Sequence, residues 1–105
     1  DLGDPEKGVI YAERAMQIMP VDPDVLDTLG WAYYRTGKHA EGEEHIRDSI
    51  KKGPTPAAHL HMAQVFIDQG RRDKARDHLE KALDLSPDDG TRSEIERLQD
   101  DIGRS

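Results

Sequence analysis

The chain has 105 residues, enough for one small domain at most, and a chain of this length buries only about 60% of its unfolded surface. Apolar residues make up 34% and charged residues 35%, and the net charge of −7 argues against the basic stripe of a nucleic-acid-binding protein. The absence of cysteine excludes disulfides and thiolate metal sites, and no apolar run approaches the roughly 18 residues of a membrane span.

Small residues and prolines recur along the chain at a fixed period. Three sets share spacings of 34 and 33 residues: Gly3, Gly37 and Gly70; Pro20, Pro54 and Pro87; and Ala15, Ser49 and Ala82. A period of this length is typical of helical repeat proteins, in which each repeat is one pair of helices. We therefore divide the chain into repeats before assigning single elements.

Residues 1–22 are expected to hold a partial repeat with only a second helix, over residues 5–19. Asp4 and Pro5 form a good helix start, and the apolar face carries Val9, Ala12 and Met16. This face would lack one partner helix. We interpret the segment as part of a longer array, or as a repeat whose first helix departs from the pattern.

Residues 23–55 are expected to form the first complete helix pair. Leu29, Gly30 and Tyr33 share one face of the first helix, Gly37 marks the turn, and Gly42 lies on the inner face of the second helix with Ile46 and Ser49. Pro54 closes the pair, because proline cannot continue a helix. Small residues such as Gly42 are expected where the two helices approach closely.

Residues 56–87 repeat this plan in a second helix pair. Its positions are occupied, in chain order, by Ala63, Phe66, Gly70, Ala75, Leu79, Ala82 and Pro87. A capping residue followed by proline is expected to start each following helix, and the three candidates are Asp22-Pro23, Thr55-Pro56 and Ser86-Pro87.

Residues 88–105 are expected to form a helix of a different kind. Ile95, Leu98 and Ile102 make a narrow apolar stripe, and charged residues cover the remaining faces. A helix with a polar back is what a repeat array needs to shield its last apolar face from water. We interpret it as a capping helix and this end of the array as its terminus.

The spacing resembles that of the tetratricopeptide repeat (TPR) family. Residues 26–33, followed by Gly42, Ile46, Ser49 and Pro54, are similar to the family pattern, with Leu26 at the usual place of tryptophan; His59 takes that place in the second pair. The resemblance implies an all-α fold, a right-handed superhelical solenoid of antiparallel helix pairs. The repeats most resemble the C-terminal repeats of bacterial TPR proteins, including arrays linked to envelope and secretion machinery. The compartment stays open between bacterial cytoplasm and envelope.

In this family the first helix of each pair lines a concave groove. The resemblance places eight residues on that surface: Asp27, Trp31, Tyr34, Arg35, Leu60, His61, Gln64 and Ile67. Tryptophan and tyrosine are favoured contacts in protein interfaces. An equally weighted alternative is that Trp31 and Tyr34 pack against the first helix of a preceding repeat, with Leu60 and Ile67 packed against Trp31.

The resemblance implies a scaffold that binds a peptide or helix of a partner protein, with a partly apolar ligand. Capture of a peptide carboxylate is not supported, because Asp27 is acidic where a cation is needed and only Arg35 is basic. One alternative is self-association, a homodimer that completes the partial first repeat with a second copy. A weaker one is that the segment belongs to the regulatory region of an enzyme.

No catalytic, metal or cofactor site is predicted. His59 and His61 point in different directions on a helix, and we interpret them, with His39, His45 and His78, as surface or boundary residues. No nucleophile elbow, glycine-rich phosphate loop or zinc-binding pair of histidines is present.

Overall fold

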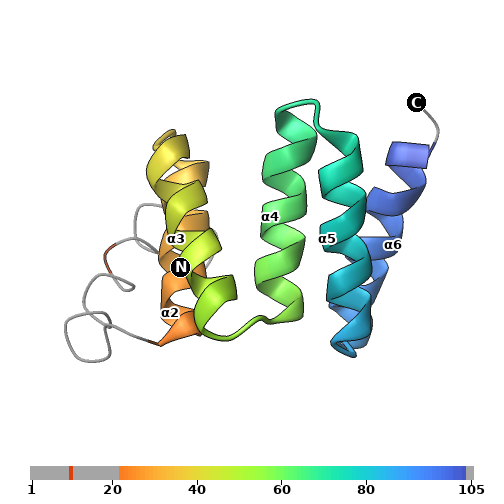
Figure 1. Ribbon diagram of the computed structural model, residues 1–105, viewed down its shortest axis with the longest axis horizontal. Coiled ribbons are helices and arrows are strands. Elements are labelled where there is room, and N and C mark those ends of the chain that lie inside the picture. The colour runs from red at the N-terminus through yellow and green to blue at the C-terminus, as the bar shows by residue number, and fades with distance from the viewer. Residues whose placement is uncertain (1–9, 11–21, 104–105) are drawn as a thin grey trace. The chain divides into compact units, whose positions relative to one another are not determined.

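The computed structural model describes residue 10 and residues 22–103, and the elements it describes there are all helices. In chain order they are α2 (Pro23–Arg35), α3 (His39–Lys52), α4 (Pro56–Asp68), α5 (Arg72–Asp84) and α6 (Asp89–Gly103) (Figure 1). The predicted all-α fold of consecutive helix pairs is confirmed. The helix expected at residues 5–19 lies, apart from Ile10, outside the described residues.

The chain divides into two compact units, residues 1–54 and 55–105. In the described part of the first unit, α2 packs along α3; in the second, α4 packs along α5, and α6 contacts both. Each unit is described by itself below. The division into repeats at residues 1–22, 23–55, 56–87 and 88–105 stays a prediction.

Helices α2 and α4 begin as the sequence predicts. The Asp22 carboxylate accepts a hydrogen bond from the Asp24 amide at 2.8 Å, and the Thr55 hydroxyl oxygen accepts one from the Ala58 amide at 3.1 Å. Each capping residue is followed by a proline in the first turn. Proline is favourable there because its missing N–H would have had no partner inside the helix.

The turn inside each helix pair is built on a glycine with a left-handed backbone. Gly37 has φ +98° and Gly70 has φ +76°, values that side chains with a Cβ rarely adopt. The Lys38 amide then donates to the Tyr33 carbonyl at 2.9 Å, and the Arg71 amide donates to the Phe66 carbonyl at 2.8 Å. These bonds satisfy carbonyl groups that a helix end leaves without a partner.

The prediction that Ser86-Pro87 starts the last helix is wrong. Ser86 ends the turn after α5 with φ 56°, and α6 begins only at Asp89. Asp88 performs the capping, because its carboxylate accepts a hydrogen bond from the Thr91 amide at 2.7 Å. This bond also lowers the pKa of the Asp88 carboxyl, since it stabilises the charged form. The helix therefore takes its cap from Asp88, two residues after Ser86.

In the first unit, two glycines let α2 and α3 approach closely. A Cβ placed on Gly42 would lie 2.6 Å from the carbonyl oxygen of Gly30, and one placed on Gly30 would lie 2.8 Å from the carbonyl oxygen of Gly42. Ile46 is fully buried beside this contact. The predicted close approach is confirmed, and it is a contact of one backbone with the other.

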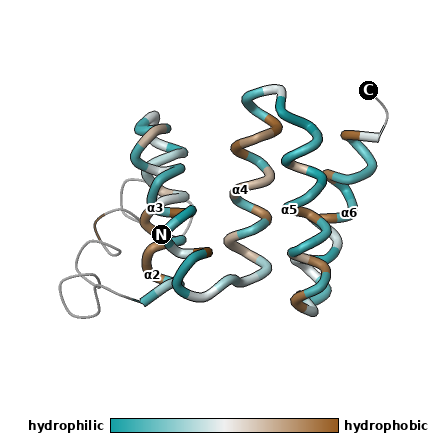
Figure 2. Tube along the Cα trace, in the orientation of Figure 1, coloured by the Kyte–Doolittle hydropathy of each residue, from teal (hydrophilic) through white to brown (hydrophobic). Residues whose placement is uncertain are grey.

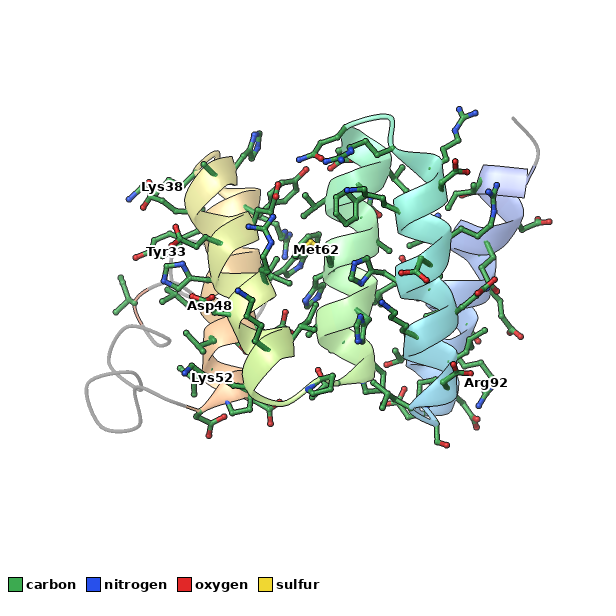
Figure 3. The ribbon with its side chains drawn as sticks, viewed as in Figure 1. Tyr33, Lys38, Asp48, Lys52, Met62 and Arg92 are labelled. Carbon is green, nitrogen blue, oxygen red and sulfur yellow. The ribbon has the colours of Figure 1, made fainter. Side chains whose placement is uncertain are left out.

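Ser49 adds a polar link between the same two helices. Its hydroxyl donates a hydrogen bond of 2.6 Å to the Pro23 carbonyl at the start of α2. In the same unit, the Lys38 ammonium lies 5.2 Å from the centre of the Tyr33 ring (Figure 3). The attraction between an ammonium and the face of an aromatic ring adds a weak contact between the turn and α2.

In the second unit, alanines stand at the positions that Gly30 and Gly42 occupy in the first unit, 33 residues earlier. Ala63 and Ala75 are fully buried, as are Leu79 and Ala82 on the inner face of α5. Helix α6 contributes Ile95, Leu98 and Ile102, which are at most 5% exposed. Figure 2 shows α5 and α6 with hydrophobic positions at intervals along mostly hydrophilic tubes. The predicted apolar stripe of the last helix is confirmed, and its role as a cap stays a prediction.

Candidate functional site

In the first unit, the predicted site residues on α2 form an aromatic stack. The rings of Trp31 and Tyr34 lie 5.6 Å apart with planes 10° apart, and the Tyr34 ring lies 4.6 Å from that of His39. Both aromatic side chains are half-buried, and Arg35 is exposed. Asp27 is buried, 6% exposed, although the sequence placed it on the groove surface.

In the second unit, the predicted site residues Leu60, His61, Gln64 and Ile67 are all half-buried on α4. Gln64 and Ile67 line a hollow of about 270 Å³. The remaining lining residues come from the start of α5 and from α6: Arg72, Arg97, Leu98, Asp101 and Ile102. We call this feature the α4–α6 hollow.

The α4–α6 hollow has an apolar floor and a charged rim. Leu98 and Ile102 are each 5% exposed and form the floor together with Ile67. On the rim, the Arg97 guanidinium donates to Glu94 through Nε at 3.3 Å and Nη2 at 2.5 Å. An apolar floor with a few polar groups at its edge is the usual composition of a binding site.

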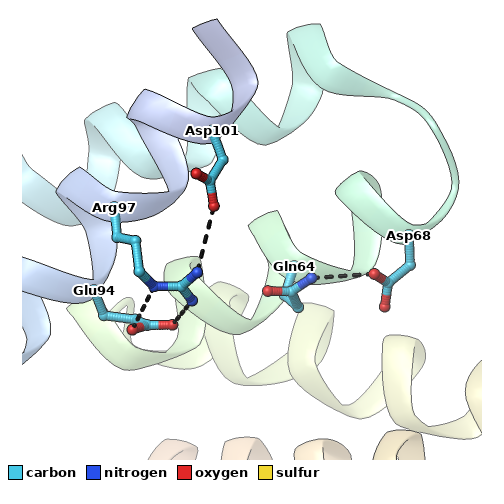
Figure 4. Close-up of polar contacts among 5 residues, drawn as sticks. All are labelled: Gln64, Asp68, Glu94, Arg97 and Asp101. Carbon is cyan, nitrogen blue, oxygen red and sulfur yellow. Dashed lines mark hydrogen bonds and ion pairs between the residues drawn. The ribbon is translucent and has the colours of Figure 1, made fainter. Parts of the chain in front are cut away.

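The rest of the rim is also held by hydrogen bonds within single helices. Arg97 donates through Nη1 to Asp101 at 3.4 Å, and the Gln64 amide donates to Asp68 at 3.1 Å (Figure 4). Pairing with Arg97 lowers the pKa of the Glu94 carboxyl. These pairs hold the side chains that line the hollow, Gln64 on α4 and Arg97 and Asp101 on α6, against a neighbour one turn away on the same helix.

The structure therefore brings together two subsets of the predicted site, one in each unit. Trp31 stacks on Tyr34, and Gln64 shares a hollow with Ile67. The groove that would join the two subsets stays a prediction.

Sequence reasoning missed the contribution of α6, because it assigned this helix to capping alone. The missing signal was the repeat period itself. Adding 33 residues to Trp31 gives Gln64, and adding 33 more gives Arg97. Arg97 thus lies on the last helix in the same repeat register as Trp31 and Gln64 on the first helices of the two pairs.

A histidine pair links α4 to α5, and it corrects the prediction for His59, which is buried, whereas His78 is half-buried, as expected of a boundary residue. His59 is 5% exposed, and its Nδ1 lies 2.9 Å from Nδ1 of His78. One ring must carry its proton on Nδ1 and the other must accept there, because a neutral imidazole has one donor and one acceptor. The His78 ring also stacks on Phe66, with centres 5.5 Å apart.

The environment of this pair favours neutral imidazoles. Burial, and next the charge of His59, lower the pKa of His78 from 6.5 to about 4. Burial, followed by the positive charge of Lys81, lowers the pKa of His59. The same positive charge disfavours a bound metal cation, and among the described residues no three potential metal ligands gather. The pair is best understood as a structural hydrogen bond.

Comparison with known proteins decides the family. A family model described as tetratricopeptide repeat matches residues 28–90, which include all of α3, α4 and α5. The chain belongs to the tetratricopeptide repeat family. This confirms the resemblance drawn from the spacing of glycines and prolines. Tetratricopeptide repeats generally mediate protein–protein interactions, and the family is one of repeat scaffolds without enzymatic activity.

A curated relative supports the same assignment. Over 51 residues, 49% of this chain, the sequence is 37% identical to the TPR repeat-containing protein PA4667 of Pseudomonas aeruginosa. The chain spans only 9% of the length of that relative. In the described part of the chain, no helix has the length and apolarity needed to cross a membrane.

Proposed function

We propose that this chain binds a peptide or helix of a partner protein, and that the α4–α6 hollow is one of the contact points. The observation that carries the proposal is the hollow itself, where Gln64 and Ile67 of α4 face Arg97 and Asp101 of α6 around an apolar floor. Helices that present such a groove are a recurring mode of peptide recognition.

The size of the hollow is compatible with a contact point for a protein ligand. Its volume is about 270 Å³. A space of this size suits one or two apolar side chains of a longer segment. The remainder of that segment would lie along the half-buried residues of α4.

The aromatic stack of the first unit is the second proposed contact. Tryptophan and tyrosine are enriched among the residues that dominate binding energy, because they offer large rigid surfaces with a polar end. Trp31 and Tyr34 already hold each other in one geometry, which reduces the entropy lost when a partner binds.

Site-specific photo-crosslinking tests this proposal. Benzoylphenylalanine replaces Gln64 at the hollow, Trp31 at the aromatic stack or, as a control, the exposed Glu80 on α5. We expect the same partner to be captured from cells of the source organism at Gln64 and Trp31, and not at Glu80. Equal capture at all three positions, or none at Gln64, would contradict the proposal.

The same experiment separates self-association from binding of another protein. Crosslinks that join two copies of this chain at Trp31, in the first unit, would favour the homodimer predicted as the alternative, in which a second copy completes the partial first repeat. Sedimentation over a wide range of concentration gives the independent answer. A strict monomer would reject the homodimer and leave partner binding in place.

A further inference from the structure

We propose that the partner segment bound at the α4–α6 hollow carries an aspartate or glutamate that lies against three cations at the turn between α4 and α5. The three are Arg71, Arg72 and Lys74, and we call them the turn cluster. This inference rests on the proposed function and adds the chemistry of the partner, an apolar side chain with a carboxylate beside it.

The turn cluster lines a hollow of its own. This second hollow has a volume of about 460 Å³ and is lined by Gly70, Asp73 and the turn cluster. Arg72 also lines the α4–α6 hollow. The two hollows therefore meet at Arg72, and a segment with an apolar side chain in the first can extend into the second.

The charges of the second hollow favour an anion. Its lining holds three cations and one carboxylate, that of Asp73, which already accepts a hydrogen bond from Arg76 at 3.3 Å. Among the ion pairs of the described residues, none involves the turn cluster. Like charges this close in the chain repel one another, so a carboxylate of the partner lowers their energy.

Phe66 holds two of the three cations near the turn. The Arg71 guanidinium lies 5.3 Å from the centre of the Phe66 ring, and the Lys74 ammonium lies 5.7 Å from it. The ring itself is 7% exposed, so it is a fixed support, and its face attracts cations. Side chains held in this way lose less entropy when a partner binds.

The charges that line the α4–α6 hollow have the same sign. Arg72 and Arg97 stand against Asp101, which accepts a hydrogen bond from Arg97 at 3.4 Å. Asp68, which ends α4, accepts one from Gln64. The start of α5 beside Arg72 has no side-chain cap, and its partial positive charge adds to that of the cations.

The net charge of the chain limits how acidic the partner can be. A charge of −7 repels a strongly acidic protein at long range. Salt screens charges over about 8 Å at physiological ionic strength, so the turn cluster dominates once the segment is in contact. We therefore expect one or two carboxylates at this point of the partner.

Short peptides test the inference on the whole chain. The probes are two acetylated and amidated hexapeptides of alanine and leucine, one with two glutamates and the other with two glutamines at the same positions. NMR follows the methyl signals of Ile67, Leu98 and Ile102 and the amide signals of residues 70–74. We expect the glutamate peptide to shift both sets saturably and to bind about threefold to fivefold tighter than the glutamine peptide, the range of an exposed ion pair.

Charge reversal at Arg72 locates the effect. Arg72→Glu should weaken binding of the glutamate peptide by about threefold or more, and an acidic residue in the first turn of a helix is compatible with the fold. The control is Arg92→Glu, which changes the net charge equally at the other end of the second unit and should leave the affinity unchanged (Figure 3).

Two results would overturn the charge preference and leave the proposed function standing. One is a glutamine peptide that binds as tightly as the glutamate peptide, and the other is equal weakening by Arg72→Glu and Arg92→Glu. No shift of the methyl signals with either peptide would also overturn the inference. Failure of the proposed function shows separately, as loss of crosslinks at Gln64.

Discussion

Gly30 and Gly42 set the distance between α2 and α3, because each glycine stands against the backbone of the other helix. A Cβ on Gly42 would also lie 2.7 Å from the Tyr34 amide nitrogen. Distances this short cannot be relieved by turning a side chain, since the neighbouring atoms belong to the backbone. The two helices must move apart to accept a methyl group.

We therefore expect Gly42→Ala to destabilise the first unit by about 1–2 kcal/mol. Overpacking costs about 1–3 kcal/mol, which outweighs the gain of up to about 1 kcal/mol from better helix propensity. Chemical denaturation measures the change. The control is Gly90→Ala in α6, where a Cβ would meet nothing closer than 3.7 Å. A Gly42→Ala protein as stable as the control would contradict the close approach.

Ser86 is a second residue whose backbone conformation is better suited to glycine than to its own side chain. Its φ of 56° lies in the left-handed region, and it precedes a proline, which restricts its conformation further. Gly37 and Gly70 occupy the comparable turns after the first helix of each pair. Serine at this position therefore carries a backbone cost that glycine avoids.

We expect Ser86→Gly to stabilise the chain by about 0.5–1 kcal/mol. The relief of about 1–2 kcal/mol of left-handed strain exceeds the added flexibility of glycine in the unfolded chain. A rise in Tm measured by calorimetry would show this. Ser93→Gly, inside α6, is the matched control and should lower the Tm. A fall with both variants would mean that residue 86 is not held in the left-handed region.

At the scale of elements, the hydrogen bond between His59 and His78 ties α4 to α5 and makes their packing sensitive to pH. The folded state lowers the pKa of His78 from 6.5 to about 4, so it disfavours the charged imidazole. Below pH 6.5 the unfolded chain binds a proton that the folded chain does not. Stability is therefore fully present above pH 6.5 and decreases as pH falls toward about 4.

We expect the free energy of unfolding to fall by about 1–2 kcal/mol over this interval, a value reduced for the solvent screening of a half-buried ring. Denaturation at several pH values measures it. His78→Gln keeps a hydrogen-bonding side chain but cannot titrate, so its stability should change less between pH 6.5 and 4. An equal pH dependence in both proteins would contradict the assignment to this pair.

The helices were predictable from the sequence because their signals are local. Proline and capping residues mark the starts of α2 and α4, and Gly37 and Gly70 mark turns that need a left-handed backbone. The start of α6 was misjudged because Ser86 and Asp88 both suit a capping position. The backbone conformation around Pro87 decides which of the two residues caps the helix.

The histidine pair and the hollow were not predictable by the same means. His59 is buried because a partner 19 residues away accepts or donates at its Nδ1, and periodicity does not identify such a pair. The hollow needs Arg97 and Asp101 of α6 beside Gln64 and Ile67 of α4. Only the folded second unit brings these side chains together.

At the scale of the whole molecule, family membership and the site address different questions. The match over residues 28–90 establishes the repeat family, whose members generally bind proteins. The arrangement of side chains at the α4–α6 hollow then supports one place for such a contact. The relative from Pseudomonas aeruginosa is much longer than this chain, which matches 9% of it.

The central claim is tested most directly by measuring how tightly the partner identified by crosslinking binds the Ile67→Ala variant. Ile67 is half-buried in the hollow, so its removal should weaken binding at least fivefold, the effect of losing more than about 1 kcal/mol at an interface hot spot. Leu85→Ala, which removes an exposed leucine after α5, is the matched control and should leave affinity unchanged. Isothermal titration calorimetry measures both, with circular dichroism to verify the fold. Equal affinities for the two variants and the parent chain would contradict the account.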